Sequence, residues 1–447
     1  MKELVKPDGT LMKILPAQKL RPDTEYVWSQ FTLPFARKGR YFIYSTLTRQ
    51  MWELDQPPGK RFPADEIHRR EDLTTLMQGY FLVPDGKDEC AFYESLSGLL
   101  RALKKPKGIK GYTILPTLAC NARCVYCYEE GMKPVTMTPE IVEQTVQYIL
   151  RTKAEGTIEI GWFGGEPLLG ESIIDRICER LRDEGVEYTS NIITNGSLLT
   201  EAVIDKMVTS WKIHHVQISM DGAEPDYIAR KQYLRYRDTY HTVIQAVNLL
   251  AARDIRVAVR CNVDEDNVGG VPQFLSDLAA AVSKKEKVYV YPAPLNAVRT
   301  GENDLAMWRR VLEDETLIRE AGFDNIPFSG RSTGLRIHHC MADTGSVAIA
   351  PDGSLYPCEH CPPESRFGDV ANGVTDGAVK SAFCRMDRTR EKCRKCPFLP
   401  DCTSFASCPV QDTHCRGKRT MQFEHSLMRM MNASDAEAQK DAQIPSC

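Results

Sequence analysis

The sequence lacks several features that would place the protein in a common class. No run of 18 or more apolar residues occurs in the 447-residue chain, which excludes an ordinary transmembrane helix. The 57 lysines and arginines nearly balance the 60 aspartates and glutamates, so no strong charge indicates a nucleic-acid partner. The first residues, MKELVKPDGTLMKIL, show neither the apolar core nor the cleavage site of a signal peptide. We therefore expect a cytoplasmic protein with no membrane partner and with reduced thiols.

Cysteine, in contrast, is abundant, with 16 residues. Ten of them lie between Cys340 and Cys447, and three more lie in PTLACNARCVYCYEE, residues 116–130. Clustered cysteines in a reducing compartment are more often metal or cofactor ligands than disulfide partners. Cys178 and Cys261 instead occupy apolar positions of a predicted helix and strand, and Cys90 lies in a predicted helix with no other cysteine nearby. We expect these three to be structural.

The central part of the chain alternates between strand and helix patterns. Polar and apolar residues follow helical spacing over 138–153, 171–185 and 239–254. Short aliphatic and aromatic runs predict six strands, at 112–117, 158–164, 190–197, 215–222, 256–263 and 287–294. Such alternation predicts an α/β fold with a parallel sheet, either doubly wound or curled into a barrel. Functional residues in these folds gather at the carboxyl ends of the strands, and the three-cysteine loop follows the first strand.

The flanking regions differ in composition and predict separate domains. Residues 1–105 read as a small α+β domain, with a hairpin over 40–55 and a helix over 63–79 that ends at Gly79. Residues 106–335 contain the α/β part and a helical connector. Residues 336–420 are rich in cysteine, proline and glycine, and metal cross-links would supply the stability that a regular core does not. Residues 421–447 predict a C-terminal helix and a polar tail.

The cysteine loop has the spacing Cys120-x3-Cys124-x2-Cys127. Three thiolates are one fewer than a closed zinc site or a fully ligated cubane requires. The pattern, including Tyr126 before the last cysteine, resembles the radical S-adenosylmethionine (SAM) enzymes. In that family a [4Fe–4S] cluster keeps one iron open, and this iron chelates the amino and carboxylate groups of SAM. A zinc ion with a distant fourth ligand is the alternative.

Further motifs at the strand ends agree with this resemblance. In the FGGEP segment, Gly164 and Gly165 allow close backbone approach, and Glu166 can accept hydrogen bonds from an ammonium group. The resemblance implies that this motif holds the amino group of SAM. It also implies that polar residues at other strand ends contact the cofactor, namely Asn195, Ser219, Asp221 and Arg260, together with Tyr126. Strand-end capping and salt bridging are the alternative roles of these residues.

The family resemblance implies a fold and a chemistry. The fold is a partial (β/α)6 barrel. One electron enters the cluster and SAM is cleaved to methionine and a 5′-deoxyadenosyl radical, which removes a hydrogen atom from an unactivated carbon. A low-potential donor such as flavodoxin or ferredoxin would supply the electron. The protein then has to hold one substrate C–H bond near the 5′ carbon and exclude water.

The C-terminal cysteines resemble the SPASM extension of radical SAM enzymes that modify peptides and proteins. That extension usually carries two auxiliary [4Fe–4S] clusters, giving three clusters in all. The resemblance implies Cys340, Cys358 and Cys408 as ligands of the first, with Cys361 preferred to Cys384 as the fourth. It implies four ligands for the second, namely Cys393, Cys396, Cys402 and Cys415.

Two observations leave the ligand sets open. The family commonly has three residues before its equivalent of Cys408, and this chain has five. If neither Cys361 nor Cys384 completes the first cluster, its open iron could bind a substrate thiolate. The alternative for the whole region is two zinc sites of the ribbon type, using Cys358, Cys361, Cys393 and Cys396.

These patterns support one main function and two alternatives. The first is a maturase that forms a thioether or carbon–carbon crosslink in a ribosomally made peptide, with residues 1–105 resembling a winged domain that captures a leader peptide by strand addition. A merely structural N-terminal cap is the alternative role of that domain. The second function is a sulfatase-type maturase that makes formylglycine. In sulfatase-maturing enzymes an aspartate that serves as a base directly follows the cysteine matching Cys358, and this chain has Glu359 at that position. The third is a non-catalytic, zinc-stabilised binding protein.

Overall fold

The computed structural model describes residues 1–7, 9–57, 59–103, 107–235, 239–295, 302–323, 345–384, 391–402, 417 and 419–425. The chain divides into two compact units. The first contains residues 1–105 and 391–402, and the second contains the described residues from 107 to 384 and those near the C-terminus. Within the described ranges, no helix combines the length and apolarity needed to cross a membrane.

The first unit contains a four-stranded antiparallel sheet with the order β1-β5-β4-β3. Its strands are β1 (Lys2–Val5), β3 (Thr32–Arg37), β4 (Arg40–Ser45) and β5 (Met51–Leu54). Strands β4 and β5 form the hairpin predicted over 40–55. Strand β3, which the sequence pattern did not predict, pairs with β4 through a tight turn at Lys38 and Gly39, both with positive φ. Strand β3 therefore forms one edge of the sheet.

A three-stranded sheet and four helices complete this part of the chain. The sheet has the order β6-β2-β7, with β2 (Glu25–Trp28), β6 (Arg61–Pro63) and β7 (Leu82–Pro84). The helices are α1 (Gly9–Ile14), α2 (Ala64–Arg69), α3 (Glu71–Gln78) and α4 (Glu89–Leu103).

The single helix predicted over 63–79 is wrong, because Arg70 is extended (φ −122°, ψ 111°) and separates α2 from α3. Ile67 and Leu73 are buried in one cluster, yet six residues at about 100° each would place them on different sides of a continuous helix. The break lets both side chains reach the same core, and Gly79 ends α3 as predicted.

The segment with Cys393 and Cys396 packs in the first unit. It contains α13 (Glu391–Arg394) and the short 3-10 helix η6 (Leu399–Asp401). Leu399 is 1% exposed and belongs to an apolar cluster formed with residues of α1 and α4. The hydroxyl of Thr46 donates to the carbonyl of Pro397 (2.5 Å). A cysteine-bearing stretch far along the chain is therefore anchored on the N-terminal residues.

Leu399→Ala is expected to destabilise the first unit by about 2–5 kcal/mol, because it leaves a cavity in that cluster. The matched control is Leu103→Ala, which truncates a leucine that is 69% exposed in the same unit. Urea denaturation followed by circular dichroism measures both variants. Equal stability of the two variants would contradict the anchoring role of Leu399.

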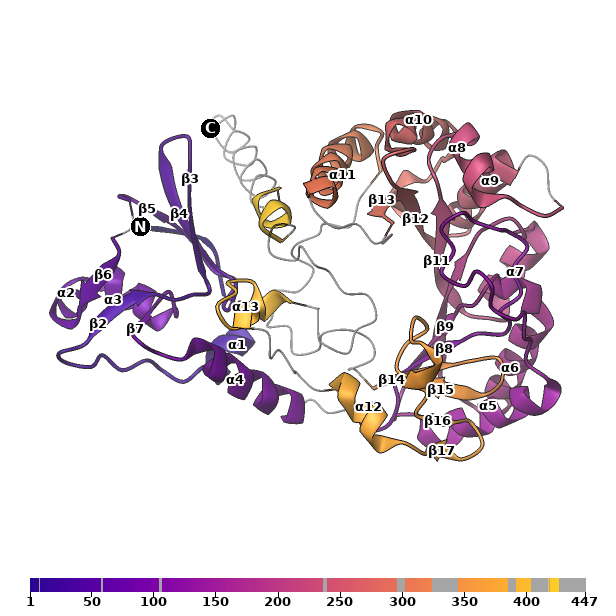
Figure 1. The fold of residues 1–447 in the computed structure, drawn as a ribbon, viewed down its shortest axis with the longest axis horizontal. Helices are drawn as coiled ribbons and strands as arrows, with labels where there is room; N and C mark the ends of the chain where they lie inside the picture. Colours follow the sequence, from indigo (N-terminus) through magenta and orange to yellow (C-terminus); the bar gives the residue numbers. More distant parts are fainter. Residues whose placement is uncertain are drawn as a thin grey trace, which may run out of the picture. The chain divides into compact units, whose positions relative to one another are not determined.

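The second unit contains six parallel strands in the order β13-β12-β11-β10-β9-β8, which confirms the predicted α/β barrel class. The strands are β8 (Gly111–Ile114), β9 (Ile158–Trp162), β10 (Tyr188–Thr194), β11 (Ile213–Met220), β12 (Arg256–Val263) and β13 (Val288–Pro294). Figure 1 shows that these strands form a curved sheet and that the helices lie on its outer side.

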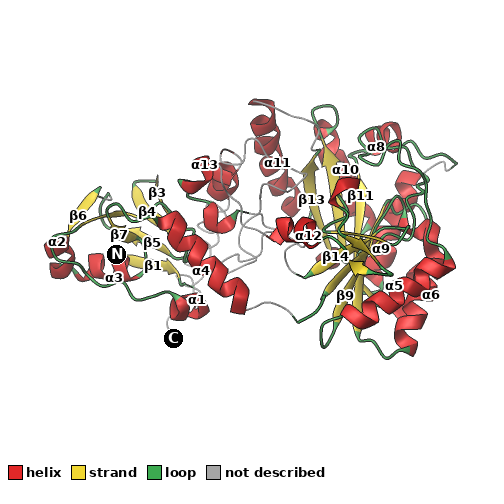
Figure 2. Ribbon diagram, turned by 60° about the horizontal axis from the view of Figure 1, so that its bottom comes forward, coloured by secondary structure: helices red, strands yellow, loops and turns green. Residues whose placement is uncertain are grey.

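Helices connect these strands and cover the sheet. They are α5 (Pro139–Thr152), α6 (Glu171–Asp183), α7 (Glu201–Thr209), α8 (Glu224–Lys231), α9 (Thr239–Ala252), α10 (Val271–Ala281) and α11 (Glu302–Glu320). Short 3-10 helices lie at η1 (Pro167–Gly170), η2 (Val268–Gly270) and η3 (Lys285–Lys287). In Figure 2 helices α5 and α6 lie on one side of the layer of yellow strands.

Four short strands extend the barrel sheet beyond β8. Strand β14 (Ser346–Ile349) pairs in parallel with β8, and β15 (Ser354–Tyr356), β16 (Gly368–Asp369) and β17 (Gly373–Val374) follow antiparallel. Helix η5 (Pro363–Ser365) and helix α12 (Gly377–Cys384) belong to the same stretch. The region that the sequence indicated as loop-rich is thus partly continuous with the barrel.

The apolar core lies between the sheet and its helices. Ile218 and Met220 of β11 face it, and Ser219 between them points to the opposite side, because successive side chains of a strand alternate between its two faces. Cys178 and Cys261 are each 1% exposed in this core, which confirms that they are structural, and Cys90 is buried in the first unit. The polar residues of the strands consequently lie on the opposite, inner face of the sheet.

Candidate functional site

The three-cysteine loop follows β8 and is held by the end of helix α8. Cys120, Cys124 and Cys127 are all partly buried. The loop runs antiparallel to residues 230–234, with backbone hydrogen bonds from Arg123 N to Lys231 O (3.0 Å), from Val125 N to Arg230 O (3.0 Å) and from Leu234 N to Asn121 O (3.0 Å). These hydrogen bonds come from an element that is distant in sequence, and they give the backbone of the loop a defined conformation.

The GGEP turn after β9 packs directly against this loop. The backbone N–H of Gly165 donates to Thr117 O (3.2 Å), and that of Glu166 donates to Ala119 O (2.9 Å). A Cβ atom on Gly165 would lie 2.5 Å from Ala119 O, closer than real Cβ contacts, and Gly164 has φ +123°. Only glycine fits both positions, as the sequence predicted from the need for close backbone approach.

Glu166 joins the ends of strands β9 and β10. Its side chain is fully buried, and burial raises the pKa of its carboxyl group. The carboxylate accepts hydrogen bonds from the backbone N–H of Asn195 (2.8 Å) and Leu168 (3.1 Å) and from the hydroxyl of Thr194 (2.7 Å). A carboxylate has about four acceptor positions, so one is left for a cofactor ammonium group.

Asn195 links β10 to the cysteine loop. Its side-chain amide donates to Oδ1 of Asn121 (2.9 Å), and its own Oδ1 accepts from the backbone and hydroxyl of Ser197. Sequence reasoning missed Asn121, although this residue directly follows the first cysteine of the motif. The structure brings Asn195 next to the loop, where its side chain makes protein contacts.

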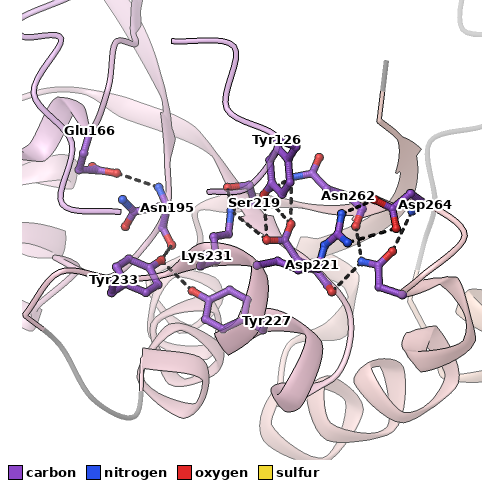
Figure 3. A network of polar contacts seen from close by, with 12 residues as sticks. Tyr126, Glu166, Asn195, Ser219, Asp221, Tyr227, Lys231, Tyr233, Asn262 and Asp264 are labelled. Carbon is purple, nitrogen blue, oxygen red and sulfur yellow. Dashed lines mark hydrogen bonds and ion pairs between the residues drawn. The ribbon is translucent and has the colours of Figure 1, made fainter. Parts of the chain in front are cut away.

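Tyr126 and Asp221 form a buried polar contact below the loop (Figure 3). The Tyr126 hydroxyl donates to the Asp221 carboxylate at 2.6 Å, and Asp221 is 0% exposed. The side-chain amide of Asn262 donates to both, at 3.0 Å to Tyr126 and 3.2 Å to Asp221. Asn262 was not among the residues that the sequence indicated for this site.

Lys231, at the end of α8, completes this group and was not foreseen. Its ammonium donates to the hydroxyls of Ser219 (2.8 Å) and Tyr126 (3.1 Å) and lies 3.7 Å from Asp221. Burial acts to lower the pKa of Lys231, but the neighbouring acidic groups, of which Asp221 is the strongest, together outweigh burial and hold that pKa well above its usual value. The spacing of residues along α8 carries no signal that would have found this contact.

Arg260 lies on the inner face of the barrel, beside Ser219 on β11 and Tyr291 on β13. Its Nε atom is buried and has no hydrogen-bond partner in the part of the chain that the structure describes. A buried guanidinium nitrogen without a partner is costly unless an anionic ligand satisfies it. The position therefore fits the carboxylate or a hydroxyl of a bound cofactor.

The segment Cys358–Cys361 lies in the same unit. The two thiols are within hydrogen-bonding reach, and this contact, with burial, raises the pKa of Cys358. The His360 ring packs against Tyr128 (4.9 Å between centroids) and Phe163 (6.0 Å), which flank the cysteine loop and the GGEP turn. Glu359 has one carboxylate oxygen that is buried and has no partner among the residues described.

The remaining predicted cysteines are only partly placed. Cys393, Cys396 and Cys402 belong to the first unit, where the backbone N–H of Cys396 donates to Cys393 O (3.1 Å). Cys340, Cys408 and Cys415 lie outside the described residues. Cys384 is the last residue of α12, and the role proposed for it as an alternative ligand stays a prediction.

The contacts of the cysteine loop bear on which metal group it can hold. The described residues contain no group of three or more His, Cys, Asp or Glu side chains placed to hold a single metal ion. A cubane makes a different demand, because each cysteine binds a separate iron. The loop offers three partly buried thiols, the glycine turn removes side chains beside it, and Arg260 offers an unsatisfied donor. These residues fit a cluster that binds SAM.

Comparisons with known proteins agree with this site. Residues 114–271 match the Radical SAM superfamily. The antilisterial bacteriocin subtilosin biosynthesis protein AlbA of Bacillus subtilis is 23% identical over 300 residues, 64% of this chain and 64% of its own. The serine-type anaerobic sulfatase-maturating enzyme of Klebsiella aerogenes is 23% identical over 318 residues, 65% of this chain and 77% of its own. The structure of anSMEcpe with bound AdoMet has a TM-score of 0.57 at 18% identity, covering 72% of this chain and 98% of that one, which shows a shared fold.

Proposed function

Because this chain is an enzyme of the radical SAM superfamily, we propose that it modifies a ribosomally made precursor peptide and forms a thioether or carbon–carbon crosslink in it. The observation that carries the proposal is the three-cysteine loop with the GGEP turn packed on it. The similarity to AlbA, a bacteriocin biosynthesis protein, supports a peptide as the substrate.

The residues of the site have distinct tasks in this reaction. When bound, the cluster and SAM supply a 5′-deoxyadenosyl radical that can remove a hydrogen atom from an unactivated carbon. Cys120, Cys124 and Cys127 would hold the cluster, and Glu166 would accept hydrogen bonds from the amino group of SAM. Arg260 would bind its carboxylate or ribose. The barrel wall excludes water and orients the substrate, which is the main contribution a protein can make to radical chemistry.

The other strand-end residues have less direct tasks. Asn195, Ser219, Asp221 and Tyr126 were expected to contact the cofactor. Their side chains are largely engaged with one another and with the loop. We propose that they support the cofactor site by fixing the loop, while the exposed atoms of Tyr126 and Ser219 complete the binding surface.

The C-terminal cysteines are proposed to bind two auxiliary [4Fe–4S] clusters of SPASM type. The contact between Cys358 and Cys361 supports placing both at the first cluster. Cys393, Cys396 and Cys402 lie on one short segment, which supports a common ligand set for the second. These clusters would accept the electron that is left when a substrate radical closes to a crosslink.

The N-terminal domain is proposed to capture the leader of the precursor peptide. Strand β3 is an edge strand, so its outer backbone groups can pair with an added peptide strand. The precursor peptide would then be held by main-chain hydrogen bonds on a domain separate from the catalytic barrel. We propose that a low-potential donor in the cytoplasm, such as flavodoxin or ferredoxin, supplies the electron.

Formylglycine formation is the second candidate function. Glu359 follows Cys358 at the position where sulfatase-maturing enzymes are expected to have their base, and one of its carboxylate oxygens is buried and unsatisfied within the described structure. The Klebsiella relative is a serine-type sulfatase-maturating enzyme, which supports keeping this alternative. A carboxylate at this position could take a proton from the substrate during either reaction.

The experiment that tests the proposal incubates anaerobically reconstituted enzyme with SAM, dithionite and synthetic peptides encoded beside its gene. Mass spectrometry should show 5′-deoxyadenosine and a peptide that has lost hydrogen atoms and resists fragmentation between the crosslinked residues. A linear product that reacts with an aldehyde probe would favour the sulfatase-type function. Iron-loaded enzyme that forms no 5′-deoxyadenosine would overturn both.

A further inference from the structure

Lys231 is a buried cation to which the proposed function assigns no role. Its side chain is only 2% exposed, although lysine is seldom buried without a specific partner. Lys231 is the last residue of α8, and its ammonium group donates a hydrogen bond to the hydroxyl of Tyr126 on the cysteine loop (3.1 Å). Figure 3 shows its ammonium pointing into the group formed by Tyr126, Ser219 and Asp221.

The contacts of Lys231 connect it to the loop in two ways. Its carbonyl oxygen accepts the backbone N–H of Arg123, which lies between the first two cysteines. Its ammonium donates to the hydroxyl of Tyr126, which lies between the last two cysteines, and the Tyr126 ring centroid is 5.7 Å from the same nitrogen. The cation is therefore fixed beside the segment that carries all three thiols.

Asp221 is the counter-charge of Lys231, but the two charges do not cancel each other's electrostatic effect on the loop. Asp221 lies beyond the end of β11 and is held from below by Asn262 and Asn267, which donate to its side chain and carbonyl. Lys231 contacts the loop through its ammonium group, which donates to the Tyr126 hydroxyl, and through its carbonyl oxygen, which accepts from the backbone N–H of Arg123. The two charges are thus held in one fixed orientation relative to the loop, and a fixed dipole acts on any charge that changes nearby.

Holding a loop with a buried ion pair costs free energy. Replacing such a pair by apolar residues of similar volume is often neutral or stabilising, because desolvating two charges costs several kcal/mol. Packing alone would be served by apolar residues at both position 221 and position 231. A buried cation has a use where negative charge is added during function, because it stabilises that charge. Reduction of an iron–sulfur cluster adds one negative charge in a poorly screened interior.

We propose that Lys231 is a positioning residue that fixes the cysteine loop through Tyr126 and raises the reduction potential of the cluster on that loop. This inference rests on the proposed function, which places a [4Fe–4S] cluster on Cys120, Cys124 and Cys127. The step concerned is a one-electron reduction of the cluster from the 2+ to the 1+ state by an external low-potential donor, with no proton transfer. A nearby cation stabilises the reduced state, whereas Asp221 opposes it.

The test is a redox titration with dithionite, followed by electron paramagnetic resonance of the signal that changes when SAM is added, since that signal belongs to the SAM-binding cluster. Lys231→Met should make reduction about tenfold less favourable, which is about 59 mV for one electron. Lys231→Arg should stay near the wild type. Asp221→Asn should shift the potential in the opposite direction, upwards.

Lys206→Met is the matched control. Lys206 also forms two carboxylate contacts, with Glu171 (2.7 Å) and Asp175 (2.8 Å), but on helices of the outer layer and 40% exposed. Its removal should leave the potential unchanged, because solvent screens it and no contact links it to the loop.

Each outcome decides the inference. An unchanged potential in iron-loaded Lys231→Met, or a shift of equal size in Lys206→Met, would overturn it. If Lys231→Met does not load iron on the loop, Asp221→Asn decides. A higher reduction potential in Asp221→Asn than in the wild type supports the inference, and an unchanged potential overturns it. A wild type with no SAM-responsive cluster would instead defeat the proposed function, so the two failures are distinguishable.

Discussion

Replacing Cys120, Cys124 and Cys127 together by alanine is expected to abolish SAM cleavage and to remove one cluster. Each cubane holds four irons, so the wild type should contain about twelve irons after anaerobic reconstitution and the variant about eight. The loss should be confined to one cluster, because the C-terminal cysteines are unchanged. Iron and sulfide analysis and the yield of 5′-deoxyadenosine measure the two effects.

The iron count also tests the auxiliary clusters. A fall from about eight to about four would mean that one auxiliary site does not hold a cubane. The set containing Cys408 would then be the first to re-examine, since the spacing before it departs from the family pattern. Zinc with almost no iron in both proteins would contradict the mechanism from its first step. Cys178→Ala is a matched control, because this buried thiol lies in the barrel core and should not affect iron content.

Gly165→Ala is expected to lower the rate of SAM cleavage by about 10²-fold, since a displacement near 1 Å in a catalytic constellation has effects of that size. The new Cβ would lie 2.5 Å from Ala119 O and 2.6 Å from Leu118 O, and both are backbone atoms that cannot move alone. The GGEP turn and the cysteine loop would have to separate. The initial rate of 5′-deoxyadenosine formation measures the effect.

A second glycine variant controls for the added methyl group. Gly269→Ala lies in the same unit, in helix η2, and its Cβ would meet no atom within 4 Å. Its activity should remain near the wild-type value. If both variants were equally active, the close packing of the turn on the loop would not matter for the reaction, and the assignment of the GGEP turn to the cofactor site would lose its main support.

The sequence predicted the parallel strands well because their signal is local. Strand β12 has the predicted bounds, Arg256–Val263, since alternating apolar residues on one face and Arg260 and Asn262 on the other mark a strand with two different environments. The cysteine spacing and the GGEP turn are also local, because a loop that binds a ligand needs its residues close together in the chain.

Features that depend on distant partners were not predictable. The break at Arg70 follows from the need of Ile67 and Leu73 to reach one core, and the helical spacing of each half hides it. Strands β14–β17 have two to four residues each, too few for a periodic pattern. Strand β14 forms on the edge that β8 offers, and β15, β16 and β17 each pair with the strand before them.

The sequence by itself indicated the chemistry that we propose for this protein, since three cysteines at that spacing, followed by a GGEP turn, resemble the radical SAM family. Only the tertiary structure decided how that loop is held and that the charge of Lys231 lies beside it. Lys231 reaches Tyr126 across 105 positions of the chain, by the fold of α8 onto the loop. The physical reason is that electrostatic and packing interactions depend on distance in space, and a residue whose role is to act on a remote neighbour leaves no trace in its own local pattern.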